Sequence, residues 1–171
     1  IRYNMINWVH RSTRGWSYGA SIDDPRTGEI IKGHVSLGSL RIRQDFLIAQ
    51  ALMNKPFAER DDNYKPMLEM ALARIRQLSA HEVGHTLGLR HNYGSSSSVP
   101  VENLRNKAWV EANGHTPSIM DYARFNYVAQ PEDKINTSGL FPRIGDYDKW
   151  AIEWGYRHFP EFKSPDAEQS K

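Results

Sequence analysis

The stretch HEVGHTLGLRH, residues 81–91, holds three of the seven histidines of the chain. On an α-helix, residues four positions apart lie on one face, about 6 Å apart along the axis. His81 and His85 can therefore hold one metal ion between their imidazoles, while Glu82 projects beside that ion. A carboxylate in this place can take a proton from a metal-bound water, as in the H-E-x-x-H arrangement of zinc peptidases.

His91 can join these residues only if the chain changes direction. On a continuing helix His91 would point away from His85, because six further residues rotate it by about 240°. Gly88 lies between the two, and glycine readily adopts the left-handed conformation that ends a helix with a sharp turn. We therefore predict that the chain turns at Gly88 and that His91 is a third metal ligand. Three histidines and one water would make a catalytic zinc site with an open position.

Composition narrows the classes of protein to consider. The chain has 171 residues, a net charge of +2 and no cysteine. We expect a single domain over residues 1–171, without disulfides or thiolate metal sites. Basic residues are scattered, so we predict no nucleic-acid binding, and no apolar run is long enough to span a membrane. The chain starts without methionine, and we expect a piece of a longer protein with a flexible tail at residues 160–171. No feature indicates an oligomeric state.

Hydrophobic periodicity predicts the elements around the histidines. Alternating apolar residues indicate a strand within residues 1–10, and two extended segments flank the turn-forming residues 23–29. The second of these, residues 29–37, is a candidate edge strand. Helical spacing predicts helices at 43–54 and at 67–87, the latter with an apolar stripe through Leu68, Ala71, Leu72, Ile75 and Leu78.

A C-terminal helix is predicted from residue 146. Asp146 is a candidate N-cap, since aspartate there can accept hydrogen bonds from the first turn. The apolar face of this helix is rich in aromatic residues, and we predict that it packs into the core through Tyr147, Trp150, Ala151 and Trp154.

The motif at residues 81–91 reproduces the H-E-x-x-H-x-x-G-x-x-H signature of the metzincin zinc metalloproteases, and the chain resembles that family. SIMDY, residues 118–122, is similar to the S-x-M-x-Y methionine turn of astacin-like and serralysin-like enzymes. The resemblance implies that Met120 lies under the metal site and that Tyr122 reaches the zinc or the oxyanion. The residue directly after His91 is Asn92, whereas astacins carry Glu and adamalysins carry Asp at the matching position.

The resemblance also implies a fold and an activity. The fold would be α+β, a zincin-like catalytic domain with a twisted mixed sheet, a long active-site helix, a Met-turn and a C-terminal helix. The activity would be that of an endopeptidase with one catalytic Zn²⁺ and Glu82 as general base, acting on a peptide or protein substrate. In residues 24–30 and 120–133 the chain looks most similar to bacterial secreted metzincin-like proteases. This resemblance implies an extracytoplasmic location (secreted, periplasmic or cell-surface). The strand predicted to border the cleft would bind substrate through Gly33, His34, Val35 and Ser36.

Several alternatives remain open at this point. Glu102 or Glu111 could replace His91 as the third ligand, whereas His115 is expected on a loop near the cleft rim. The domain could instead bind a peptide or glycan without cutting it, keeping its zinc, or it could be purely structural. Three histidines would also accept other divalent ions. Calcium is possible at the acidic residues 59–63, although a solvated loop explains them equally well.

Overall fold

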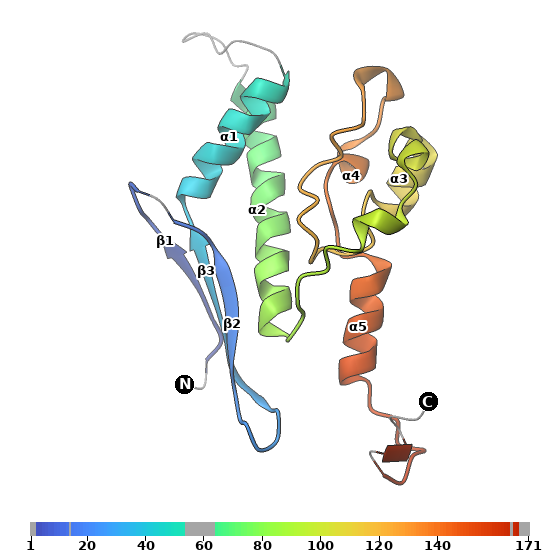
Figure 1. Cartoon of the computed structure of the whole chain (residues 1–171). Coiled ribbons are helices and arrows are strands. Elements are labelled where there is room, and N and C mark those ends of the chain that lie inside the picture. Colours follow the sequence, from blue (N-terminus) through green and yellow to red (C-terminus); the bar gives the residue numbers. More distant parts are fainter. Residues whose placement is uncertain (1–2, 14, 54–63, 165, 168–171) are drawn as a thin grey trace.

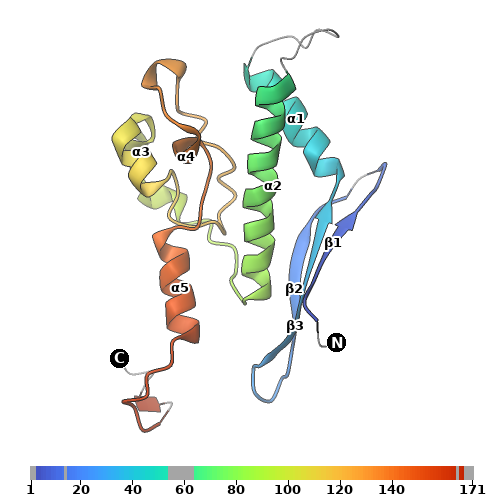
Figure 2. The same ribbon diagram turned by 180° about the vertical axis from the view of Figure 1, so that it is seen from behind.

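The long helix α2, Tyr64–Thr86, forms the centre of the molecule. The structure is a computed structural model that describes residues 3–13, 15–53, 64–164 and 166–167. In both views α2 lies between a small β-sheet and a C-terminal part made of short helices and loops (Figure 1, Figure 2). The molecule therefore has two parts, one on each side of the helix that carries the histidine motif.

The sheet has three strands in the order β1-β3-β2. β1 pairs in parallel with β3, with Met5 beside His34, and β2 pairs antiparallel with β3, with Tyr18 beside Ser36. The prediction of an edge strand at residues 29–37 is wrong, because β3 has a hydrogen-bonded partner on each side. The described strands are β1 (Met5–Val9), β2 (Tyr18–Asp23) and β3 (Ile30–Gly38).

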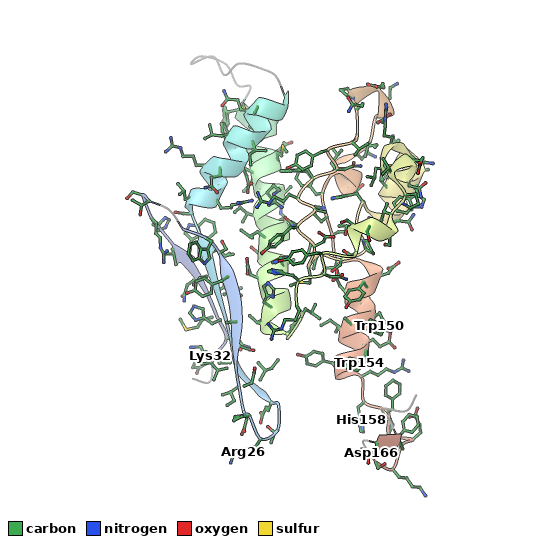
Figure 3. All side chains as sticks on the ribbon, viewed as in Figure 1. Arg26, Lys32, Trp150, Trp154, His158 and Asp166 are labelled. Atoms are coloured by element: carbon green, nitrogen blue, oxygen red, sulfur yellow. The ribbon has the colours of Figure 1, made fainter. Side chains whose placement is uncertain are left out.

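The hairpin between β2 and β3 has the turn chemistry predicted from the sequence. Gly28 has a φ of 73°, a left-handed conformation that glycine adopts without strain. The Asp24 carboxylate accepts hydrogen bonds from the backbone N–H and the side chain of Arg26, which lies at the tip of the hairpin (Figure 3). These bonds close the turn on itself.

Helix α1, Leu40–Met53, packs against α2, and the buried face of α2 is not the predicted one. Leu68 and Leu72 of the predicted stripe are exposed, although Ala71 is buried. Residues at intervals of three or four positions form the face that is buried, and most of them near the C-terminal end are polar: Met67, Ala71, Arg74, Gln77, His81 and Gly84. The helix therefore turns a polar face inward, as expected of a helix that lines a site.

The C-terminal part is built from short elements. Helix α3, Lys107–Asn113, begins at Asn106, whose side chain accepts a hydrogen bond from the backbone N–H of Trp109. Such an N-cap satisfies one of the donors that a helix start leaves unpaired. The remaining elements are η1 (Ser96–Ser98), η2 (Val101–Arg105), η3 (Pro131–Asp133), α4 (Thr137–Leu140) and α5 (Asp146–Tyr156).

Helix α5 occupies the predicted residues, but two predictions about it are wrong. Its N-cap is Gly145, and Asp146 is the first helical residue instead. Its aromatic face is exposed, because Trp150 and Trp154 are 57% and 75% accessible and project from the helix (Figure 3). Aromatic spacing on a helix thus predicted the element correctly and its burial incorrectly.

The α+β class predicted from the sequence is confirmed by the mixed sheet and the long helix α2. Among the described residues, no helix is long and apolar enough to cross a membrane. Of the predicted tail at 160–171, residues 165 and 168–171 lie outside the described residues, as do the acidic residues 59–63.

Candidate metal centre

The chain reverses direction immediately after α2. Gly88 has a φ of 89°, and the backbone N–H of Leu89 donates to the carbonyl of Gly84, 3.1 Å away. A left-handed glycine with such a backward bond is a common helix ending, because it satisfies a carbonyl of the last turn. Three residues further on, the N–H of Asn92 donates to the carbonyl of Met120. The segment that carries His91 is thereby held between the helix end and the residues around Met120.

This turn brings three imidazoles together. Ligand nitrogens of His81, His85 and His91 lie within 4.8 Å of one another, and the Nε2 atoms of His85 and His91 are 3.1 Å apart. Two nitrogens bound to one tetrahedral zinc at ordinary bond lengths are separated by about 3.3 Å. The spacing therefore fits a single ion shared by the three side chains.

The other ring nitrogens are held by the protein. Nδ1 of His81 donates to the carbonyl of Ile119 at 2.8 Å, and Nδ1 of His85 donates to the carbonyl of Leu89 at 2.9 Å. A carbonyl only accepts, so each Nδ1 carries the proton and each Nε2 keeps its lone pair for a metal. Nδ1 of His91 is hydrogen bonded to the hydroxyl of Tyr93 at 2.9 Å.

Burial acts on these groups in the direction that metal binding needs. It lowers the pKa of His81 and that of His91, which is the less buried of the two, and a lowered pKa favours the neutral imidazole. A neutral imidazole is the form that donates a lone pair to a metal. The three side chains are therefore suited to bind a divalent cation in position, and the lowered pKa values of His81 and His91 favour the protonation state that binding needs.

Glu82 is buried next to these histidines. Its side chain is 5% exposed, and its carboxylate accepts a hydrogen bond from the backbone N–H of Gly19 in β2. Burial raises the pKa of Glu82, because a desolvated carboxylate loses the hydration of its charge. The strand and the helix together fix this carboxylate at the wall of the cleft.

The turn at residues 118–122 lies under the histidines. Met120 is fully buried, and a Cβ added at Gly84 would come within 2.5 Å of its sulfur. A side chain at position 84 would therefore require Met120 to shift from its packed position against α2. The ring of Tyr122 lies 4.6 Å from the ring of His91 and 5.7 Å from that of His81, measured between centroids.

Two buried carboxylates hold this turn in place. Asp148 of α5 accepts hydrogen bonds from the hydroxyl of Ser118 and the backbone N–H of Ile119, at 2.6 and 2.7 Å. Asp121 accepts from the hydroxyl of Ser95 and the backbone N–H of Ser96, at 2.8 and 2.9 Å. Because the carbonyl of Ile119 accepts from His81, Asp148 is connected to the first histidine through a single residue, Ile119.

A cleft of about 410 Å³ opens beside the histidines. On one side it is lined by residues 15–19, which lead into β2, and on the other by Asp121, Tyr122 and Arg124. Its floor is the inward face of α2, from Arg74 to His85. A ligand in this cleft would therefore meet the edge of the sheet, the histidines and the turn at Met120 together.

The comparison with protein families agrees with this geometry. A family model described as Met-zincin matches residues 63–171, more than half of the chain. The chain belongs to the Met-zincin family. Searches of curated proteins and of solved structures found no match to this Met-zincin. The resemblance to metzincins predicted from the sequence is thus confirmed.

The Met-zincin fold does not bring all the predicted residues to the cleft. Gly33, His34, Val35 and Ser36 lie on the central strand β3, and the described residues that line the cleft do not include them. The edge strand that borders the cleft is β2, through Tyr18 and Gly19. His34 instead contacts neighbours within the sheet, with Nε2 3.3 Å from the hydroxyl of Ser36.

The alternative ligands lie elsewhere in the described chain. Glu111 accepts a hydrogen bond from the backbone N–H of Asn136, and Glu102 is an exposed residue of η2. His115 lies on a loop, as predicted, but it is buried rather than at the rim, with Nε2 3.1 Å from the carbonyl of Ala123. The group of possible metal ligands found among the described residues is the three histidines of the motif.

Several residues of the site were not predicted from the sequence, among them Tyr93, Asp148 and Arg74. Tyr93 follows His91 by two positions, and an aromatic hydroxyl so close to a ligand could have been noticed. Asp148 and Arg74 gave no comparable signal, because their partners are distant in sequence or on another helix. Their place at this Met-zincin centre follows only from the packing of α2, α5 and the Met120 turn.

Proposed function

We propose that this Met-zincin is a zinc-dependent endopeptidase. The observation that carries the proposal is the convergence of His81, His85 and His91 beside the buried carboxylate of Glu82. Zinc bound by the three histidines would lower the pKa of a coordinated water and polarise the scissile carbonyl. Zinc is the expected ion because the site offers only nitrogen ligands and leaves room for a fourth.

Glu82 would act as general base and then as general acid. It would take a proton from the attacking water and deliver it to the leaving amine. Burial raises its pKa towards the range where both transfers are efficient, while the hydrogen bond from Gly19 keeps the carboxylate in position. The strand β2 would also bind the substrate, because a peptide can add to the edge of a sheet in extended form.

Tyr122 would stabilise the oxyanion. Burial, together with Tyr93, raises the pKa of the Tyr122 phenol, so it keeps its proton at neutral pH and can donate a hydrogen bond. Replacing Tyr122 by Phe should reduce kcat on the order of 10²-fold without loss of zinc. An unchanged kcat would remove Tyr122 from the mechanism and leave the role of Glu82 intact.

The proposal is tested by replacing Glu82 with Gln and measuring zinc content and cleavage of a peptide library. Zinc should remain at one ion per chain, while cleavage falls on the order of 10²–10⁴-fold. Glu102→Gln is the matched control, since Glu102 is exposed and would matter only if it were the third ligand. Peptide binding by the zinc-loaded wild type without any cleavage would support the non-catalytic binding domain instead. An extracytoplasmic location belongs to this proposal and rests on the family resemblance alone.

A further inference from the structure

The cleft extends from the histidines along α2 to a buried arginine. Arg74 precedes His81 by seven residues, two helical turns, so both lie on the same face about 10 Å apart along the axis. Gln77 lies between them, and all three line the cleft. The side chain of Arg74 is only 2% exposed, so it forms the inner end of this cleft.

Two guanidinium groups share one carboxylate at this end of the cleft. Asp45 of α1 lies 3.7 Å from Nε of Arg74 and 3.3 Å from Nε of Arg41, so one carboxylate serves two guanidinium groups. Burial lowers the pKa of Arg74 most; Asp45 raises it, and Arg41 and Arg124, which line the same cleft, lower it further. The resulting value of about 10 leaves Arg74 protonated at neutral pH.

The acidic groups that line the cleft are already engaged. The carboxylate of Asp121 accepts from Ser95 and Ser96, and that of Glu82 accepts from Gly19. Neither carboxylate forms an ion pair with Arg74, whose ion-pair partner among the described residues is Asp45.

Two donors of Arg74 have no hydrogen-bond acceptor among the described residues. Its Nε and Nη1 atoms are buried without a hydrogen bond, although Nε lies 3.7 Å from Asp45, whose two carboxylate oxygens also lack hydrogen bonds. Oε1 of Gln77 is likewise unpartnered. A buried donor without an acceptor costs free energy, and a ligand group that supplies the acceptor would recover that cost. The ring of Phe125 lies 5.1 Å from the guanidinium carbon and limits its movement.

We propose that Arg74, with Arg41 and Arg124 near it, forms a specificity subsite for a substrate carboxylate close to the scissile bond. Guanidinium binds carboxylate strongly, because its parallel N–H groups match the two carboxylate oxygens. The inference rests on the proposed peptidase activity, since the subsite is part of the same cleft. The carboxylate is the side chain of Asp or Glu in an endopeptidase substrate, and a free C-terminus is the other source of the same chemistry.

The test compares peptides that differ only by Glu or Gln at each position within two residues of the cleavage site, with the C-terminus amidated or free. Wild type should cleave the amidated Glu peptide with a kcat/KM at least tenfold above that of the Gln peptide, at one position. In the double variant D45N/R74M, which removes one buried charge of each sign, the ratio should fall to about one. Arg76→Gln, on the exposed side of the same helix, should leave the wild-type ratio unchanged.

A second variant covers the case in which the double variant does not fold. Arg124→Gln changes an exposed side chain and should lower the Glu-to-Gln ratio severalfold. A preference seen only with a free C-terminus would assign the subsite to a terminal carboxylate. A wild-type ratio near one for all peptides would overturn the subsite and leave the peptidase proposal intact.

Calorimetric binding of the same peptides to the zinc-loaded protein separates the two proposals. If no peptide is cleaved but the Glu peptide binds at least tenfold more tightly than the Gln peptide, and D45N/R74M or R124Q reduces that difference, the subsite stands and the peptidase proposal fails. If no peptide is cleaved and both bind equally, both proposals fail.

Discussion

The two parts of the molecule on either side of α2 are stabilised in different ways. On the side of the sheet, β1, β2, β3 and α1 are held mainly by regular backbone hydrogen bonds. On the other side, residues 94–148 contain only short helices, and buried polar side chains supply many of the bonds. Asp121, Asp148 and Asn126 each bind backbone groups there, the last at 2.7 Å from the carbonyl of Leu104.

The comparison shows what each part contributes to the metal centre. Helix α2 presents His81, Glu82 and His85 by its own periodicity, which needs no distant partner. The other side provides Tyr122 and the carbonyl that orients His81, and their positions depend on a few side chains. We therefore expect the second part to be more sensitive to single polar substitutions than the first.

The largest effect should come from the metal, because His91 lies beyond the turn and joins the helix to the other part. Zinc at about 1,000 times its dissociation constant should stabilise the wild type by about 4 kcal/mol, measured as the difference in unfolding free energy with and without chelator. His91→Ala should abolish most of this difference, whereas His158→Ala, an exposed histidine outside the cluster, should not. Equal stabilisation of the His91 variant would contradict the joint role of the three histidines.

Asp148 offers the next test of the difference between the two parts. Asp148→Asn should lower the unfolding free energy by about 3 kcal/mol, because an amide cannot accept from Ser118, Ile119 and Gly145 together. Zinc affinity should fall as well, since the Ile119 carbonyl orients His81. Asp146→Asn on the same helix, with an exposed carboxylate, is the control and should change both quantities little. A similar loss of unfolding free energy in both variants would mean that α5 is destabilised by any such substitution, and not by the loss of the Asp148 hydrogen bonds.

Gly84 tests the contact between α2 and Met120. Gly84→Ala should destabilise the protein by about 1–3 kcal/mol, because the new methyl would overlap the Met120 sulfur. Gly155→Ala has open space around it in α5 and should stabilise the protein by about 0.5–1 kcal/mol. Chemical denaturation of the two variants measures the difference, and a stabilising effect at Gly84 would show that Met120 can move away.

The smallest expected effect concerns Tyr93, the hydroxyl partner of His91. Tyr93→Phe should weaken zinc binding roughly tenfold, the lower end of the effect for groups that orient metal ligands, because Tyr93 is largely exposed. Competition with a chromogenic chelator would measure the affinity, with the exposed Tyr3→Phe as control. No change would mean that the packing of His91 alone orients its ring.

The sequence allowed much of this site to be predicted, and the errors share one cause. The hairpin around Gly28 and the ranges of α2 and α5 follow from local patterns, and the structure has them close to where they were expected. The apolar stripe of α2 and the buried aromatic face of α5 were wrong, because periodicity gives the spacing of a face and not its environment. Residues such as Trp154 and Leu72 have the right spacing for a core but lie at the surface.

By itself the sequence determined the three histidines, the glutamate and the glycine that turns the chain, because helix geometry and a left-handed glycine act over a few residues. The tertiary structure alone decided that Tyr18 and Gly19 of β2, rather than residues 33–36 of β3, border the cleft, since strand order depends on pairing between distant segments. It also decided that Asp148 supports the Met120 turn and that Arg74 closes the cleft. Those roles arise when segments about 30 residues apart are packed together. Burial then strengthens the hydrogen bonds and charge interactions of a single carboxylate or guanidinium.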